Sequence, residues 1–214
     1  MVYVTGVDDK DKVIAQVVAL GGSAEKEGVT ERTTHLVAPS VLRTSNFLLG
    51  VCKVPHIVTP EYVAECAAAK RWLPVTAAAI PKYAPTRKDD DPLRGFTPTP
   101  LADVLRKRGA LPAMPLHGTT FYLCSTIPGP EREALRDAIS AAGGALRDKP
   151  DAVVASDMAI VKTAEDAARL PARERTALSR AGVSLYARHL PTLAILQLGV
   201  SAALKRAFLI PPPA

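Results

Sequence analysis

The chain has 214 residues, of which 48% are hydrophobic, and it carries a formal net charge of +6 at pH 7. This length accommodates two domains of about 100 residues, and the hydrophobic content excludes wholesale disorder. No apolar run reaches the roughly 20 residues that span a bilayer, so we expect no membrane partner. The basic balance suits an acidic partner, either a phosphorylated peptide or a nucleic acid, without choosing between them.

The N-terminal segment predicts strands that alternate with helices. A β-branched and aromatic strand, Val2–Thr5, begins almost at the first residue, which leads us to expect a fragment of a longer protein. Asp8–Asp11 offers N-cap residues for a helix with one apolar face, and Gly21-Gly22 ends that helix. A short strand follows at 23–26. Because strands separated by helices form parallel sheets covered on both faces, the sequence predicts an α/β fold.

The next segment, Thr33–Pro74, indicates the fold most clearly. It contains a buried strand at Thr34–Ala38, a helix that opens at Arg43-Thr44, and a second strand at His56–Val58. A further helix carries Trp72 near its end, and we expect this large apolar side chain to pack in the core.

Residues 81–117 differ in composition from the segments before and after them, and this composition predicts a linker. They are rich in proline and contain the charged run Arg87–Asp91. Within them, Thr99 and Pro100 predict the start of a short helix that ends at Gly109. A helix this short is marginal alone in water, so we expect it to dock on a flanking domain.

From Gly118 the plan of the first segment repeats. Gly143-Gly144 ends a helix 122 residues after Gly21-Gly22 ended the first one. The apolar run Leu193–Leu204 predicts a buried helix. The expected strands are 119–124, 145–147, 152–155 and 183–186, and the expected helices are 130–142, 163–170, 172–181 and 191–198.

The first copy resembles a BRCT domain. Its marks are Thr34-His35-Leu36-Val37, Arg43-Thr44, Ile57-Val58-Thr59 and Arg71-Trp72-Leu73. The resemblance and the internal repeat imply two tandem BRCT repeats, 1–80 and 118–214, with the second more divergent. Each is expected to be a small parallel four-stranded sheet flanked by helices. The linker 81–117 would hold one short helix near 100–108.

The sequence offers no catalytic constellation and no cofactor site. Phosphate-loop, dinucleotide-binding and serine-hydrolase motifs do not occur in it. Its three cysteines (Cys52, Cys66, Cys124) and four histidines lack metal-ligand spacing, and we interpret the cysteines as reduced core thiols. We therefore expect an interaction module and not an enzyme.

The resemblance implies a phosphate site in the first copy. In tandem BRCT families a Ser or Thr and the following Gly bind phosphate through a hydroxyl and a backbone N–H, and here these are Thr5 and Gly6. The alternative is that the pair only ends a strand in a tight turn. The family's lysine, three residues after Arg43, is Asn46 here, which donates a hydrogen bond but has no charge. Lys10, Lys12 and Arg43 itself are the candidates to restore the cation.

The resemblance also implies contacts to a peptide. The arginine at the position of Arg43 would hold the peptide backbone. Leu48 and Ile127 would line an apolar pocket between the repeats, with Arg188 close by. The alternatives are a solvated arginine at a helix start and ordinary packing of the two apolar residues.

Taken together, the resemblance implies a phosphopeptide-binding adaptor region of a larger nuclear scaffold in DNA-damage signalling or in chromosome or kinetochore assembly. The expected partner is a peptide phosphorylated on Ser or Thr, and the fragment is expected to be monomeric. One alternative is a DNA-binding BRCT region that uses the basic clusters Arg87-Lys88, Arg106–Arg108 and Lys205-Arg206. Another is a protein–protein module that needs no phosphate.

Overall fold

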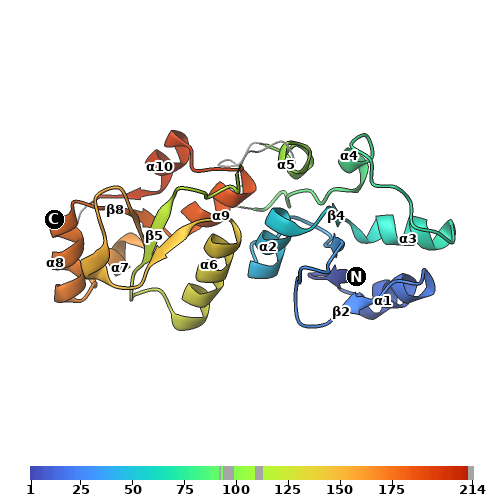
Figure 1. Cartoon of the computed structure of the whole chain (residues 1–214), viewed down its shortest axis with the longest axis horizontal. Coiled ribbons are helices and arrows are strands. Elements are labelled where there is room, and N and C mark those ends of the chain that lie inside the picture. Colours follow the sequence, from blue (N-terminus) through green and yellow to red (C-terminus); the bar gives the residue numbers. More distant parts are fainter. Residues whose placement is uncertain (92, 94–98, 109–112, 212–214) are drawn as a thin grey trace. The chain divides into compact units, whose positions relative to one another are not determined.

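The computed structural model describes residues 1–91, 93, 99–108 and 113–211. It divides into two compact units, residues 1–112 (unit 1) and 113–214 (unit 2), whose elements Figure 1 labels. The repeat boundaries expected at 80 and 118 stay predictions. In the described ranges, no helix combines the length and apolar character that crossing a membrane requires.

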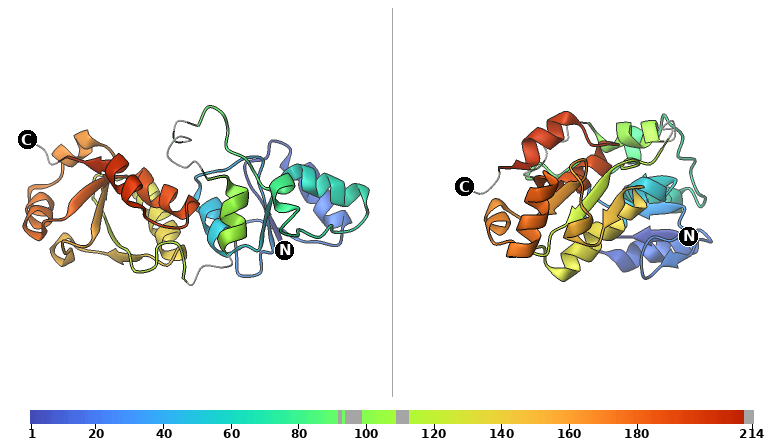
Figure 2. Two further views of the ribbon diagram at one scale, coloured as in Figure 1. Left: turned by 90° about the horizontal axis from the view of Figure 1, so that it is seen from above. Right: turned by 60° about the vertical axis from the view of Figure 1, so that its left-hand side comes forward.

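Unit 1 is a parallel sheet between helices. The strands are β1 (Val2–Val4), β2 (Ala24–Glu25), β3 (His35–Val37) and β4 (His56–Val58), in the order β2-β1-β3-β4. The main helices are α1 (Lys10–Ala19), α2 (Ser45–Lys53) and α3 (Pro60–Ala68). Helices α1 and α3 lie together on one face and α2 lies on the other, as Figure 2 shows from above.

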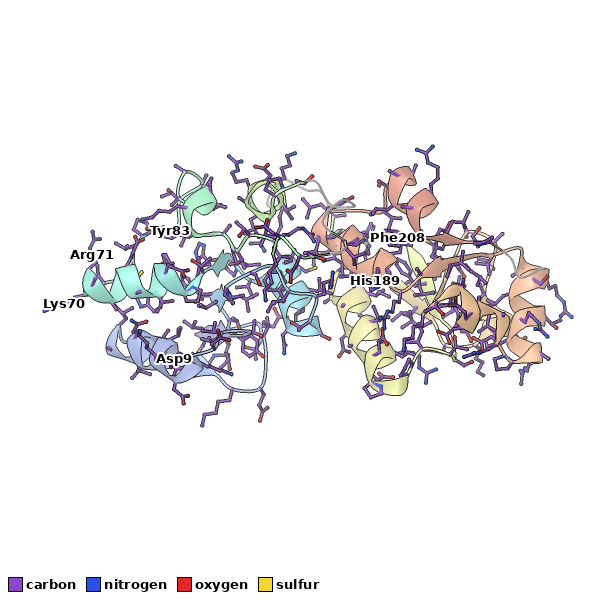
Figure 3. All side chains as sticks on the ribbon, turned by 180° about the vertical axis from the view of Figure 1, so that it is seen from behind. Asp9, Lys70, Arg71, Tyr83, His189 and Phe208 are labelled. Carbon is purple, nitrogen blue, oxygen red and sulfur yellow. The ribbon has the colours of Figure 1, made fainter. Side chains whose placement is uncertain are left out.

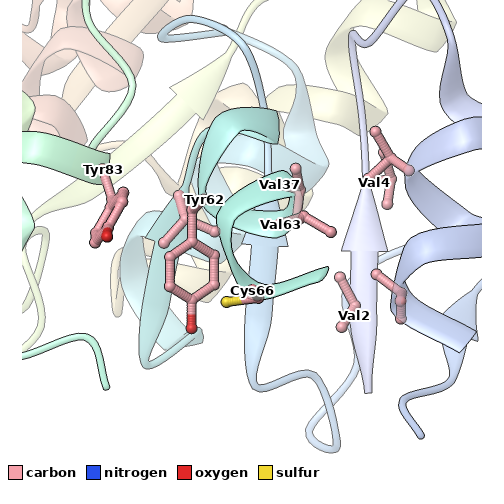
Figure 4. Close-up of a cluster of buried hydrophobic side chains, with 10 residues drawn as sticks. Val2, Val4, Val37, Tyr62, Val63, Cys66 and Tyr83 are labelled. Carbon is pink, nitrogen blue, oxygen red and sulfur yellow. The ribbon is translucent and has the colours of Figure 1, made fainter. Parts of the chain in front are cut away.

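Strand alternation explains this arrangement. Val2, Val4 and Val37 point to the face that α1 and α3 cover, and they form one buried cluster with Tyr62 and Val63 of α3 (Figure 4). The intervening strand residues point to α2. A glycine, Gly50, stands in α2 where any added Cβ would collide with the buried Leu36 side chain of β3.

Part of the expected linker belongs to the core of unit 1. Helix α4 (Ile80–Tyr83) places Tyr83 in the cluster of Figure 4, edge-on to Tyr62 with ring centroids 4.9 Å apart. The Tyr83 hydroxyl donates to Glu65 Oε2 at 2.9 Å. Ala84 and Leu93 are buried as well. The sequence did not predict this packing, because a proline-rich segment is typical of a linker and Tyr83 is a single aromatic residue within it.

The short helix within the expected linker docks on unit 1. Helix α5 (Leu101–Arg108) buries Leu101, Val104 and Leu105, the face predicted from the sequence. The Arg108 guanidinium donates to carbonyls at the end of α2 and just beyond it: Gly50 O at 3.3 Å, Val51 O at 2.7 Å, Val54 O at 2.7 Å and Pro55 O at 2.9 Å. Carbonyls at a helix end lack partners further along the helix, so a cation here satisfies them. The expected end at Gly109 lies outside the described residues.

Unit 2 repeats the sheet with one addition. Strands β5 (Thr120–Leu123), β6 (Ala145–Arg147), β7 (Met158–Val161) and β8 (Ser184–Ala187) are parallel in the order β6-β5-β7-β8. A fifth strand, β9 (Leu209–Ile210), pairs antiparallel with β8. The helices are α6 (Gly129–Ala141), α7 (Ala164–Ala168), α8 (Ala172–Ala181), α9 (His189–Leu196) and α10 (Ala202–Phe208). The predicted fold, two tandem α/β units with parallel sheets, is confirmed.

Two expectations for unit 2 are wrong. The strand expected at 152–155 is instead β7, at Met158–Val161, where all four side chains are buried whereas Val154 is 46% exposed. The buried Asp157 organises the intervening turn by accepting from Val154 N and Arg147 Nε, both at 3.0 Å. The apolar run 193–204 forms two helices and not one, because Leu198 has φ +62° and breaks the helix after α9.

Trp72 packs in unit 1 as expected. Its indole N–H donates to the Leu20 carbonyl at 3.2 Å, and its ring lies 5.1 Å from the His35 ring. His35 also lies 4.8 Å from His56. This half-buried group of rings closes the amino end of the sheet.

Stability between pH 6.5 and pH 4 tests the environment of His35. Burial first, and then the neighbouring His56, lower the pKa of His35 from 6.5 to about 4. The unfolded chain therefore binds a proton in this range that the folded chain does not. The free energy of unfolding should fall as pH falls from 6.5 to 4, by up to about 3 kcal/mol. Urea unfolding at pH 7 and pH 4 should show a smaller loss for His35→Gln; equal losses in both proteins would contradict a buried neutral His35.

The docking of α5 is tested by Arg108→Ala. Because the guanidinium serves several carbonyls at the end of α2, we expect this variant to lose about 2–3 kcal/mol of unfolding free energy. Lys107→Ala, an exposed neighbour on the same helix, is the control and should lose less than about 0.5 kcal/mol. Comparable losses in both variants would show that the Arg108 contacts do not hold α5.

Candidate functional site

The turn after β1 carries the two residues expected to bind phosphate. The Thr5 N–H donates to the Val37 carbonyl at 3.0 Å, which fixes the turn to the end of the sheet. Gly6 is exposed and has φ +64°, and a Cβ there would lie 2.8 Å from Leu42 Cδ1. The left-handed conformation therefore favours glycine at this position. Among the described residues, the Gly6 N–H has no hydrogen-bond partner.

Asn46 lies in the first turn of α2, and both the oxygen and the nitrogen of its side-chain amide form hydrogen bonds within unit 1. Its Oδ1 accepts from the Val29 N–H at 3.2 Å, and its Nδ2 donates to the Tyr3 hydroxyl at 3.1 Å. Gly28 makes room for it, because a Cβ there would lie 2.7 Å from Asn46 Oδ1. Asn46 thus ties α2 to β1 and to the loop before β3, and its role as a direct phosphate ligand stays a prediction.

Lys10 begins α1 on the other side of the same tyrosine. Its Nζ lies 5.8 Å from the centroid of the Tyr3 ring, within range of a cation–π interaction. Asp9 precedes it as N-cap and accepts from the Lys12 N–H at 3.1 Å; Figure 3 labels Asp9 at this helix start. Lys10 and Asn46 thus both contact Tyr3, Lys10 at the ring and Asn46 at the hydroxyl. Tyr3 itself lies two residues before Thr5 in the chain. Sequence reasoning had not singled out Tyr3.

Arg43, the expected peptide ligand, is ion-paired with the segment that follows α4. Its Nη1 donates to Asp91 Oδ1 at 2.7 Å, and Arg87 Nη1 donates to the other oxygen of Asp91 at 3.2 Å. The Leu93 N–H also donates to Asp91 Oδ1, at 3.0 Å. Burial alone would raise the pKa of Asp91, but the Leu93 N–H and the two guanidinium groups lower it on balance. Asp91 therefore stays ionised and holds Arg43 in place.

The remaining three expected residues lie as follows. Leu48 is buried in α2, at 2% exposure, and Ile127 is buried after β5, at 1% exposure. Arg188 precedes α9 and forms an ion pair with Glu131 of α6. Their shared role in a peptide pocket stays a prediction.

In unit 2 a buried carboxylate fills the loop after β5. Glu174 of α8 is 5% exposed, and its Oε1 accepts from the Tyr122 hydroxyl at 2.9 Å and from the Ser125 N–H at 3.0 Å. Its Oε2 accepts from the Ser125 hydroxyl. Burial first, and then this same carboxylate, raise the pKa of the Tyr122 hydroxyl. The sequence analysis did not predict a role for Glu174. The only sign of it in the sequence is a single acidic residue within an arginine-rich helix.

Most arginines of the basic clusters are engaged inside unit 1. Arg87 binds Asp91, Arg106 forms an ion pair with Asp103, and Arg108 binds the end of α2. The remaining members, mainly lysines, are exposed and lie apart in the sequence. Nucleic-acid binding by these clusters therefore stays a prediction.

Comparison with known proteins finds BRCT relatives for the first unit. Residues 1–80 match the family model described as the Regulator of Ty1 transposition protein 107 BRCT domain. A 53-residue segment is 42% identical to PAX-interacting protein 1 of Bos taurus and of Mus musculus. This segment is 25% of the chain and spans only 5% of the length of either relative.

Solved structures show the same fold over both units. The BRCT5–BRCT6 domains of S. pombe Brc1 have a TM-score of 0.68 at 19% identity, covering 94% of this chain and 93% of that one. The complex of Rtt107p with a phosphorylated histone has a TM-score of 0.63 at 14% identity, covering 100% of this chain and 92% of that one. The two units therefore have the fold of tandem BRCT structures, and residues 1–80 match a BRCT family model.

The carboxylate of unit 2 can be tested by Glu174→Ala. This change leaves the buried Tyr122 hydroxyl and the Ser125 N–H without their acceptor, which should cost about 2–3 kcal/mol of unfolding free energy. Thr176→Ala, an exposed position on the same helix, should change the stability by less than about 0.5 kcal/mol. If denaturant unfolding shows no difference between the two variants, the carboxylate is not a structural member of unit 2.

Proposed function

We propose that this chain is a phosphopeptide-binding module whose phosphate site is the turn after β1. The observation that carries the proposal is at Gly6, an exposed residue that directly follows Thr5 and whose N–H has no hydrogen-bond partner among the described residues. A phosphate can accept hydrogen bonds from a hydroxyl and from a backbone N–H of this kind. Lys10 supplies the nearby charge that Asn46 lacks.

The peptide would continue from this site toward Arg43. The ion pair with Asp91 keeps Arg43 extended while leaving its side chain 38% exposed, so the guanidinium retains donors for a peptide carbonyl. An arginine held in advance loses less side-chain freedom on binding.

The relatives support this class of ligand. Rtt107p, which shares the fold, has been solved in complex with a phosphorylated histone. We propose accordingly that the parent protein is a nuclear scaffold of DNA-damage signalling or chromosome assembly, and that this region acts as a monomeric interaction module without enzymatic activity. A DNA-binding role is less well supported, because the arginines of the basic clusters are largely paired within unit 1.

Binding to matched peptides tests the function. Degenerate peptide pools with a central phosphoserine or phosphothreonine, and the same pools without phosphate, are titrated against wild type and Thr5→Ala. We expect the phosphorylated pools to bind at least about tenfold more tightly, and Thr5→Ala to remove most of this preference.

The control is Ser125→Ala, in the corresponding turn of unit 2, where Glu174 occupies the donors. This variant should retain the phosphate preference of wild type. Equal affinity of wild type for phosphorylated and unphosphorylated pools would reject the proposed function.

A further inference from the structure

The two units place the same pair of residues at the same point of the sheet. Tyr3 and Tyr122 each lie in the first strand of their unit, paired on both sides by parallel strands. In each unit the residue two positions later donates its N–H to the third strand, at 3.0 Å in unit 1 and 2.9 Å in unit 2. Gly6 and Ser125 follow immediately. Tyr3 therefore corresponds to Tyr122, and Gly6 to Ser125.

Unit 2 shows what this pair does with an anion. One oxygen of Glu174 accepts from both the Tyr122 hydroxyl, at 2.9 Å, and the Ser125 N–H, at 3.0 Å. The tyrosine hydroxyl and the turn N–H thus converge on a single anionic oxygen. Glu174 comes from the first turn of α8, the helix that precedes the fourth strand.

In unit 1 the residue that reaches the tyrosine is an amide and not a carboxylate. Asn46 lies in the first turn of α2, which likewise precedes the fourth strand. Its Oδ1 accepts from the Val29 N–H, which fixes the orientation of the amide and turns Nδ2 toward Tyr3. Nδ2 therefore donates to the Tyr3 oxygen, at 3.1 Å. The tyrosine acts here as acceptor, and its own proton remains to be donated.

Two donors of unit 1 are thus left without an acceptor where unit 2 has a carboxylate. Within the part of the chain that the structure describes, neither the Tyr3 hydroxyl proton nor the Gly6 N–H has an acceptor. Tyr3 and Thr5 also share one face of β1 and its extension, because strand side chains alternate.

We propose that the Tyr3 hydroxyl is a phosphate ligand, donating together with the Gly6 N–H to one phosphate oxygen as Tyr122 and Ser125 do to Glu174. This inference rests on the proposed function and adds a ligand to its site. Asn46 is then a positioning residue that holds the hydroxyl without filling the anion position. Lys10, whose Nζ lies over the Tyr3 ring, brings positive charge to the same group.

The test is a titration of inorganic phosphate into the ¹⁵N-labelled full chain, following the amide signals of Gly6 and Ser125. In wild type the Gly6 signal should shift and saturate, whereas the Ser125 signal should not move because Glu174 holds its N–H. Tyr3→Phe keeps the ring and its contact with Lys10 but lacks the hydroxyl. We expect it to weaken phosphate binding about tenfold or more, the range of a hydrogen bond to a charged group.

The matched control is Tyr122→Phe, the same deletion in unit 2, which should leave the phosphate affinity at Gly6 unchanged. If Thr5→Ala weakens binding while Tyr3→Phe binds like wild type, the Tyr3 inference is overturned and the proposed function stands. Equal weakening by both Tyr→Phe variants would likewise overturn it, as a general effect of losing a hydroxyl. If Gly6 shows no saturable shift in wild type, the phosphate site itself fails, and the inference with it.

Discussion

In each unit a tyrosine hydroxyl in the first strand contacts the first turn of the helix that leads into the fourth strand. We propose that the partner on that helix determines what the neighbouring turn can bind. In unit 2 the partner is Glu174, whose negative charge uses the donors of the turn. In unit 1 it is Asn46, which carries no charge and leaves the hydroxyl proton and the Gly6 N–H unpaired among the described residues. The turn of unit 2 is thus occupied by a carboxylate of its own unit, whereas the turn of unit 1 is not.

The contacts of Asn46 in the structure suggest a different role for it from the one that the sequence suggests. From the sequence alone, the replacement of the family's lysine by Asn46 removes a positive charge from the expected phosphate site. In the structure its amide is engaged with Val29 and Tyr3, so it acts on the site by orienting a neighbour. In the proposed site the positive charge would come from Lys10, whose Nζ lies 5.8 Å from the centroid of the Tyr3 ring. A buried carboxylate at this helix position, as in unit 2, would compete with any phosphate because like charges repel in a site of low dielectric.

The fold was largely predictable because its signals are local. The apolar strand Thr34–Ala38, the glycine pairs that end the first helix of each copy, and the tryptophan that follows α3 each depend on neighbouring residues. The expected strand at 152–155 failed for a physical reason. A run of small and apolar residues fits either a strand or a turn, and the buried Asp157 that selects the turn depends on a partner in β6.

The site was predictable only in part. The turn and the family pattern suggested Thr5, Gly6, Arg43 and Lys10 as site residues, which stays a prediction, but gave none of the side chains that these residues contact in the structure. Asp91 looked like part of a solvated charge run, although it joins Arg43 across 48 residues. Glu174 reaches Ser125 across 49 residues, and no local pattern marks a contact of that kind.

The most direct test of the account is an experimental structure of the full chain with a phosphoserine peptide selected from a degenerate pool. The account predicts a phosphate within about 3 Å of the Gly6 nitrogen, the Thr5 hydroxyl and the Tyr3 hydroxyl, with Glu174 still bound to Ser125. A phosphate bound at the Ser125 turn, or at Asn46 without contact to Tyr3 and Gly6, would contradict it.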